Sequence, residues 1–197
     1  MNYFLTDQTI AYLDGQLIEQ FDRLRSLLAI DNINIIGEVN ALFSSLDTLI
    51  RASLLQLANA VYAENCEKDV HRTLDEDWLD FILAAYDPMS KYVYYNEMDR
   101  KRARLIEALM ASPDKAGELK STLRQMSFLC RIYAVRVTDE AALQAFRDEE
   151  ETLVRWIAEK DNRTCPVCWT RDGKVYEIEF LPPKPHPNCR CTYRRLP

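Results

Sequence analysis

Hydrophobic residues recur every three or four positions along most of this chain, which is the spacing of one buried face of an α-helix. The first stripe consists of Leu13, Leu17, Phe21, Leu24 and Leu28. A polar break at residues 31–34 follows, and residues 36–61 then carry a wider stripe: Val39, Leu42, Phe43, Leu46, Leu49, Ile50, Leu54, Leu57 and Val61. We expect two long amphipathic helices that pack against each other.

A third, shorter helix is expected over residues 74–86. Thr73, followed three positions later by Glu76, has the form of a capping box, in which two side chains satisfy backbone N–H groups at a helix start. Pro88 then ends the helix, because proline disfavours helical angles in the residue before it. An aromatic segment that we expect to be extended comes next and contains Tyr92, Tyr94 and Tyr95.

Helical spacing resumes over residues 97–111. Pro113 is expected at the first position of a further helix that runs through Cys130, because that position needs no backbone N–H donor. Thr138 is expected to cap a last long helix over residues 141–158, since a threonine hydroxyl accepts from the free N–H groups of a helix start.

The pattern changes after Lys160. An Asp-Gly pair at residues 172–173 precedes the β-prone run 175–180, and glycine accepts the positive φ that a tight hairpin turn requires. Prolines stiffen the chain beyond that run: Pro182, Pro183, Pro185 and Pro187. We therefore predict a mainly α fold, with a helical body over residues 1–160 and a small C-terminal hairpin module over residues 161–197.

This last segment holds four of the six cysteines and one of the two histidines. Cys165 and Cys168 form a C-x-x-C pair, and His186, Cys189 and Cys191 follow beyond the prolines. Two such groups can hold one Zn²⁺ ion at about 2.3 Å per Zn–S bond. Cys165, Cys168 and Cys189 belong to either possible ligand set, and the fourth ligand is Cys191 or His186. We expect a structural zinc ion that holds the module together.

Two other uses of these cysteines stay open. The chain starts without the basic and apolar regions of a signal peptide, and no apolar run approaches the ~18 residues that cross a bilayer, so we expect synthesis in a reducing cytoplasm and no membrane partner. In that compartment closely spaced cysteines are more often metal ligands than bridges. Disulfides formed after release from the cell, or a thiol redox pair, are the alternatives.

The net charge of −6 argues against a protein that binds nucleic acid over its whole surface. From Thr164 onward, however, six basic residues outnumber three acidic ones, which gives a mildly basic tail. Arg190, Arg194 and Arg195 lie beside the cysteines together with Tyr193. This tail is a candidate for contact with DNA, through phosphate groups.

Several other residues have ordinary structural interpretations. Cys66 and Cys130 are expected in the core, His71 on the surface, and the basic run at residues 100–104 on a solvated helix face. The acidic run at residues 148–151 is expected to be a solvated face as well, or one that docks on a basic partner. Trp156 and Trp169 are expected to cover the metal segment.

The end of the chain resembles the C-terminal signature of the phage Mu F-like (SPP1 gp7-type) minor head proteins, a phage head morphogenesis family. The matching elements are Trp156, Asp161, Arg163-Thr164-Cys165 with Cys168, then Asp172-Gly173-Lys174-Val175, Pro182-Pro183, and His186-Pro187-Asn188-Cys189-Arg190-Cys191. The resemblance covers about a quarter of the chain, with both cysteine groups, the turn and the prolines in the family's order.

The resemblance implies a structural minor capsid protein of tailed phages and prophages. Such a protein would assemble in the host cytoplasm, become part of the virion, and contact the portal protein and other head proteins. A zinc module that contacts packaged DNA is the alternative. An enzyme is not expected, because a nuclease centre needs a histidine base and the chain offers only His71 and His186.

Overall fold

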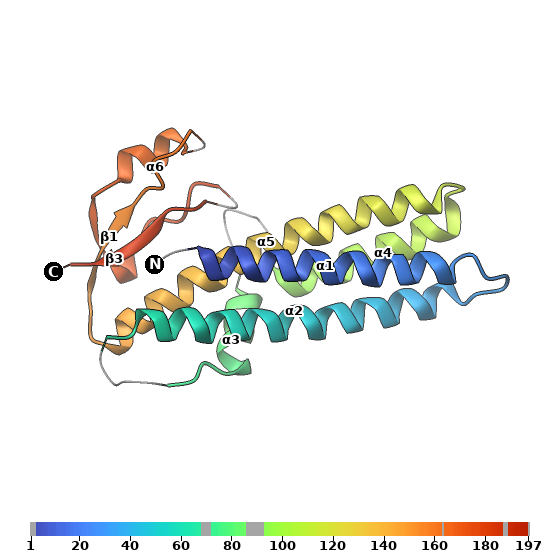
Figure 1. Cartoon of the computed structure of the whole chain (residues 1–197), viewed down its shortest axis with the longest axis horizontal. Helices are drawn as coiled ribbons and strands as arrows, with labels where there is room; N and C mark the ends of the chain where they lie inside the picture. Colours follow the sequence, from blue (N-terminus) through green and yellow to red (C-terminus); the bar gives the residue numbers. More distant parts are fainter. Residues whose placement is uncertain (1–2, 68–71, 86–92, 163, 187–188, 197) are drawn as a thin grey trace.

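The computed structural model describes residues 3–67, 72–85, 93–162, 164–186 and 189–196. Figure 1 shows a long body of helices with a small module of strands at one end, where both chain termini also lie. The helices are α1 (Phe4–Leu27), α2 (Ile35–Asn65), α3 (Glu76–Ala84), α4 (Tyr94–Ala111), α5 (Lys115–Asp148) and α6 (Pro166–Arg171). The strands are β1 (Leu153–Ile157), β2 (Val175–Glu177) and β3 (Thr192–Arg195), and a 3₁₀ turn, η1, spans Ile178–Phe180. The expected fold, a mainly α chain with a small C-terminal β module, is confirmed.

The body is held by the hydrophobic stripes that the sequence displays. Helices α1, α2 and α5 pack on one another, and α4 packs on α2 and α5. The predicted stripe of α1 is buried from Leu13 to Leu24, with Leu28 packed at its margin. Burial of this much apolar side-chain surface is the main stabilising term of the body.

Three helices begin at polar side chains that accept hydrogen bonds from backbone N–H groups. Asn34 accepts from Gly37 at the start of α2 at 3.0 Å, and Asp114 accepts from Gly117 at the start of α5 at 2.9 Å. Pro113 therefore precedes the cap and is not the first helical residue. At α3 the cap is Asp75, and the Thr73 capping box is wrong because the chain becomes helical only at Glu76.

The aromatic segment differs from the expected extended piece. Tyr94 and Tyr95 are the first residues of α4, whereas Tyr92 lies outside the described residues. Tyr94 is fully buried, with its ring 5.2 Å from that of Tyr133 in an edge-to-face arrangement. Tertiary packing of these rings on α5 thus decides the conformation, where local alternation suggested a strand.

The expected last helix over residues 141–158 is wrong at both ends. Helix α5 continues without a break from Lys115 to Asp148, and Thr138 is buried inside it, with its hydroxyl oxygen 2.7 Å from that of Thr6. Glu149 is the C-cap residue of this helix, and Glu150 follows with a positive φ of 65°. Residues Leu153–Ile157 then form strand β1, in which Val154 and Trp156 are the buried positions.

The sheet is antiparallel, in the order β2-β1-β3. Val154 pairs with Tyr176 on one side, and Trp156 pairs with Tyr193 on the other. The β-prone run 175–180 is a strand only over β2, which pairs with β1, and it then turns into η1. Gly173 has a φ of 76°, in agreement with the Asp-Gly turn.

Candidate metal centre

The first pair of cysteines is held by the start of α6. Cys165 is the N-cap residue, and its sulfur accepts the backbone N–H of Cys168 at 3.4 Å. Pro166 occupies the first turn, where its fixed φ suits a helix start. This turn brings the two sulfurs of the C-x-x-C pair to the same side of the chain.

The second group reaches the first across the proline segment. Cys189 and Cys191 lie just before β3, and the sulfur of Cys189 is 3.4 Å from that of Cys168. Two thiolates bound to one tetrahedral zinc ion would be separated by about 3.8 Å. A disulfide would need about 2.05 Å. None of the six cysteines forms a disulfide, and the 3.4 Å separation is nearer to that of two ligands of one ion than to a bond between the sulfurs.

The five predicted donors form two overlapping groups. Cys165, Cys168 and His186 make one, Cys168, Cys189 and Cys191 make the other, and the donor atoms of each group lie within 4.8 Å of one another. Because Cys168 belongs to both, one ion beside its sulfur is close to donors from either group. The cluster could therefore hold a metal ion.

A small hydrophobic core surrounds the cluster. The sulfur-bearing residues Cys168, Cys189 and Cys191 are buried in a group that also contains Leu143, Phe146, Val154, Trp156, Ile178 and Tyr193. Trp156 covers the cysteines as expected. Trp169 does not, because 49% of its surface is exposed. On the open side a cleft of about 490 Å³ separates the module from α1 and α5, which leaves a path by which an ion can enter.

The thiols perturb one another strongly. Hydrogen bonding from Cys189 lowers the pKa of Cys191 to about 5, with further help from Cys168 and Trp156. The same shared hydrogen bond to Cys191 raises the pKa of Cys189, and burial raises that of Cys168 to about 12. Burial opposes ionisation at Cys165 too, but hydrogen bonds from Cys168 and His186 lower its pKa. The hydrogen bonds thus favour the thiolate form, which is the form that binds a metal ion, at Cys165 and Cys191 over Cys168 and Cys189.

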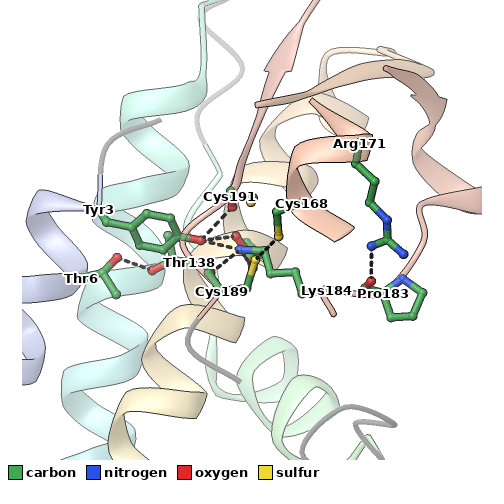
Figure 2. A network of polar contacts seen from close by, with 10 residues as sticks. Tyr3, Thr6, Thr138, Cys168, Arg171, Pro183, Lys184, Cys189 and Cys191 are labelled. Carbon is green, nitrogen blue, oxygen red and sulfur yellow. Dashed lines mark hydrogen bonds and ion pairs between the residues drawn. The ribbon is translucent and has the colours of Figure 1, made fainter. Parts of the chain in front are cut away.

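The backbone of the second cysteine group is tied to the helical body by a buried polar network (Figure 2). Lys184 forms an ion pair with Asp139 of α5 at 2.5 Å and donates to the carbonyl oxygen of Cys189 at 3.2 Å. The Tyr3 hydroxyl donates to Asp139 at 2.9 Å and lies 3.2 Å from the carbonyl oxygen of Cys191. No local pattern in the sequence predicted these roles of Tyr3, Asp139 and Lys184.

Two arginines of the basic tail form ion pairs within the chain, one of them with the acidic run at residues 148–151. Arg195 forms an ion pair with Glu149, whose side chain is fully buried, and Arg190 pairs with Asp161. The expectation that residues 148–151 form a solvated face is therefore wrong for Glu149. Tyr193 is buried as well, and of the candidate DNA contacts Arg194 is the exposed one.

The remaining expectations fall in the helical body. Arg100 and Arg102 pair with Glu97 and Asp99 along α4, as a solvated face predicts. Lys101 does not lie on this solvated face. Only 7% of this residue is exposed, and its ammonium nitrogen lies 3.3 Å from a carboxylate oxygen of Glu97. Both core cysteines are where they were expected, with Cys130 buried and Cys66 packed against the core. His71 lies outside the described residues.

Comparison with known proteins gives one match. The model of a family described as phage Mu protein F like protein matches residues 56–194, which include the end of α2, helices α3 to α5 and nearly all of the module, but not α1. No curated protein and no solved structure matches the chain. Within the described residues, none of the helices has the length and apolarity that a membrane span requires.

Proposed function

This chain belongs to the phage Mu protein F-like family, and we propose on that premise that it is a minor head protein whose C-terminal module is held in shape by a zinc ion. The family is one of phage head morphogenesis, so the chain has a structural role in phage heads. The finer part of the proposal concerns the metal, the partners and the place of the protein in the virion.

The single observation that supports the zinc proposal best is the convergence of five donors from two separate segments. Zinc prefers four sulfur and nitrogen ligands in a tetrahedron, and four of the five residues would supply them: Cys165, Cys168, His186, Cys189 and Cys191. A site filled by four protein ligands leaves no position for a reactive water. Its binding free energy then goes into folding, about 10–16 kcal/mol in isolated zinc-finger peptides.

The proposed role is one of contact with other head proteins. The zinc-bound module, residues 161–197 together with strand β1, would present a fixed surface at one end of the helical body. The portal protein is the first partner to test, and the assembled virion is the proposed location. Assembly would take place in the host cytoplasm, where the thiols remain reduced.

Contact with packaged DNA has less support. Arg190 and Arg195 already form ion pairs within the chain, which leaves Arg194 as the exposed arginine of the tail. A gel-shift titration at low salt tests this alternative, because phosphate contacts would give retarded DNA whose amount falls steeply as salt is added.

The experiment for the main proposal joins metal analysis to a binding assay. The purified chain should contain one zinc per molecule by mass spectrometry, and it should be retained by the portal protein of the same phage. Cys189→Ser should lose both the zinc and the retention, whereas Cys66→Ser, which lies outside the cluster, should keep both. A chain without metal would overturn the zinc proposal. A zinc-loaded chain that no head protein retains would overturn the proposed contact.

A further inference from the structure

One face of the three-stranded sheet is open to solvent. Strand β1 buries Val154 and Trp156, so Leu153 and Arg155, which alternate with them, lie on the opposite face. Val175 of β2 is the register partner of Arg155 and is 44% exposed. We call this side the outer face of the sheet, and its exposed members are Leu153, Arg155, Val175, Glu177 and Arg194.

Two arginines lie directly opposite each other on the outer face. Arg155 of β1 is the register partner of Arg194 of β3, and both side chains are exposed. In the described part of the chain, neither arginine forms an ion pair. Like charges directly opposite each other on antiparallel strands are destabilising. An anionic group between the two guanidinium groups would remove this repulsion.

Apolar side chains flank the two arginines. Leu153 is 38% exposed, and Val175 lies beside Arg155 on the neighbouring strand. The phosphates of a nucleic acid offer no apolar group to cover such residues, whereas protein interfaces combine arginine with apolar contacts. The outer face therefore suits a protein surface on which a carboxylate lies next to a hydrophobic side chain.

Helix α3 carries this combination on its own surface. Phe81 is 73% exposed, and Asp77, one turn before it on the same side, is exposed and forms no ion pair within the described residues. Glu76 and Asp80 share Arg51 as an ion-pair partner, so α3 as a whole remains acidic. Figure 1 shows α3 apart from the sheet, so the two surfaces of one chain do not meet.

We propose that the outer face of the sheet binds α3 of a second copy of this chain. Asp77 of the second copy then lies between the two arginines, and its Phe81 lies on Leu153. The spacings agree, because side chains one turn apart on a helix are about 5–6 Å apart. Leu153 and Arg155, two positions apart on a strand, are separated by about 6.8 Å.

The contact joins different surfaces of the two copies. Each copy therefore keeps one unused surface of each kind until the assembly closes on itself, as a symmetric dimer or a ring. This inference goes beyond the proposed contact with the portal protein and does not depend on it.

Sedimentation velocity of the purified chain over a range of concentrations tests the proposal. The wild type should exceed the mass of one chain as its concentration rises. Salt raised from about 0.05 M to about 0.5 M should weaken the association, because it screens exposed charges. A sheet variant, Arg155→Glu with Arg194→Glu, and a helix variant, Asp77→Lys, should each remain monomeric. Phe81→Ala should weaken the association about tenfold, as loss of an aromatic anchor does.

A mixture of the two charge variants gives the sharpest result. The sheet variant keeps Asp77 and the helix variant keeps both arginines, so one native contact can form between them. The mixture should therefore associate although neither variant does so alone. Two controls change the charge by the same amounts at exposed positions elsewhere: Lys120→Glu with Arg124→Glu on α5, and Glu19→Lys on α1. Both controls should associate as the wild type does.

Three outcomes would overturn the proposal: a wild type that is monomeric at every concentration, a sheet variant that associates as the wild type does, or a mixture that stays monomeric. A monomeric wild type that retards DNA in a gel shift, with the retardation lost in the sheet variant, would assign the outer face to phosphate groups instead. Circular dichroism and metal content equal to those of the wild type verify that the variants fold. No portal protein is present, so the proposed portal contact keeps its separate test.

Discussion

Arg195 of the last strand forms an ion pair with Glu149 at the end of α5, where the glutamate side chain has no exposed surface. The guanidinium also donates to the carbonyl oxygen of Asn65 at the end of α2 and lies 4.9 Å from the ring centre of Phe146. The other carboxylate oxygen of Glu149 accepts the backbone N–H of Glu67 at 2.6 Å. The last strand is therefore fastened to the ends of two long helices.

Arg195→Met should lower the free energy of unfolding by about 3–5 kcal/mol, because it leaves a buried carboxylate without its counter-charge. Arg194→Met is the matched control, since Arg194 precedes it on the same strand and is exposed. That variant should change stability by less than about 0.5 kcal/mol. Urea denaturation of the three proteins measures both values. Equal losses in the two variants would mean that the buried pair contributes nothing specific.

The helices of the body could be predicted because their buried positions are close in sequence and repeat with the period of the helix. The course of the chain between Thr138 and Ala158 could not. Alanine and leucine positions suggested one more helix there, whereas Leu153–Ile157 is a strand whose partners lie downstream on both sides. A strand of this kind is set by long-range pairing, which the local pattern does not contain.

The candidate site could also be predicted only in part from the sequence. Its five donors could be named from spacing alone, because residues two or three positions apart must share one small region. The residues that hold it against the body could not be named. Tyr3 and Asp139 are 136 positions apart in the sequence, and only the packing of α1 along α5 brings their side chains together. Burial of Trp156 and exposure of Trp169 were likewise set by the fold.

Cys189→Ser, or removal of the metal by a chelator, should unfold the module and leave the helical body folded. The reason is that the cysteines belong to a hydrophobic cluster separate from the one that holds the long helices. Far-ultraviolet circular dichroism should stay nearly unchanged, while the near-ultraviolet signal of Trp156 is lost. Cys66→Ser should preserve both signals. Loss of most of the helical signal in Cys189→Ser would contradict this separation.

The buried carboxyl of Asp139 should make stability depend on pH. Burial raises its pKa from 3.8 to about 6, although Lys184 and Tyr3 act in the opposite direction. The folded state then holds a proton that the unfolded state has already released between about pH 4 and 6. Stability conferred by this group therefore falls as pH rises through that window, by up to about 3 kcal/mol, and is constant above it.

The measurement for Asp139 is a comparison with Asp139→Asn at several pH values, in which titrations common to both proteins cancel. The stability of the wild type relative to the variant should decrease from pH 4 to pH 6.5. The reverse trend, a relative gain with rising pH, would mean that the ion pair with Lys184 outweighs burial and holds the carboxyl in its charged form.

Gly15→Ala should stabilise the protein by about 0.5–1 kcal/mol, because alanine loses less backbone entropy than glycine inside a helix. A Cβ atom at this position in α1 would meet nothing within 4 Å. Gly117→Ala is the contrasting variant. There the new Cβ would lie 2.2 Å from a carboxylate oxygen of Asp114, so that side chain must turn away and give up its capping bond to the start of α5. That loss costs about 1 kcal/mol and removes any gain. Thermal unfolding of both variants measures the difference, and a Gly15→Ala protein less stable than the wild type would contradict the open space beside α1.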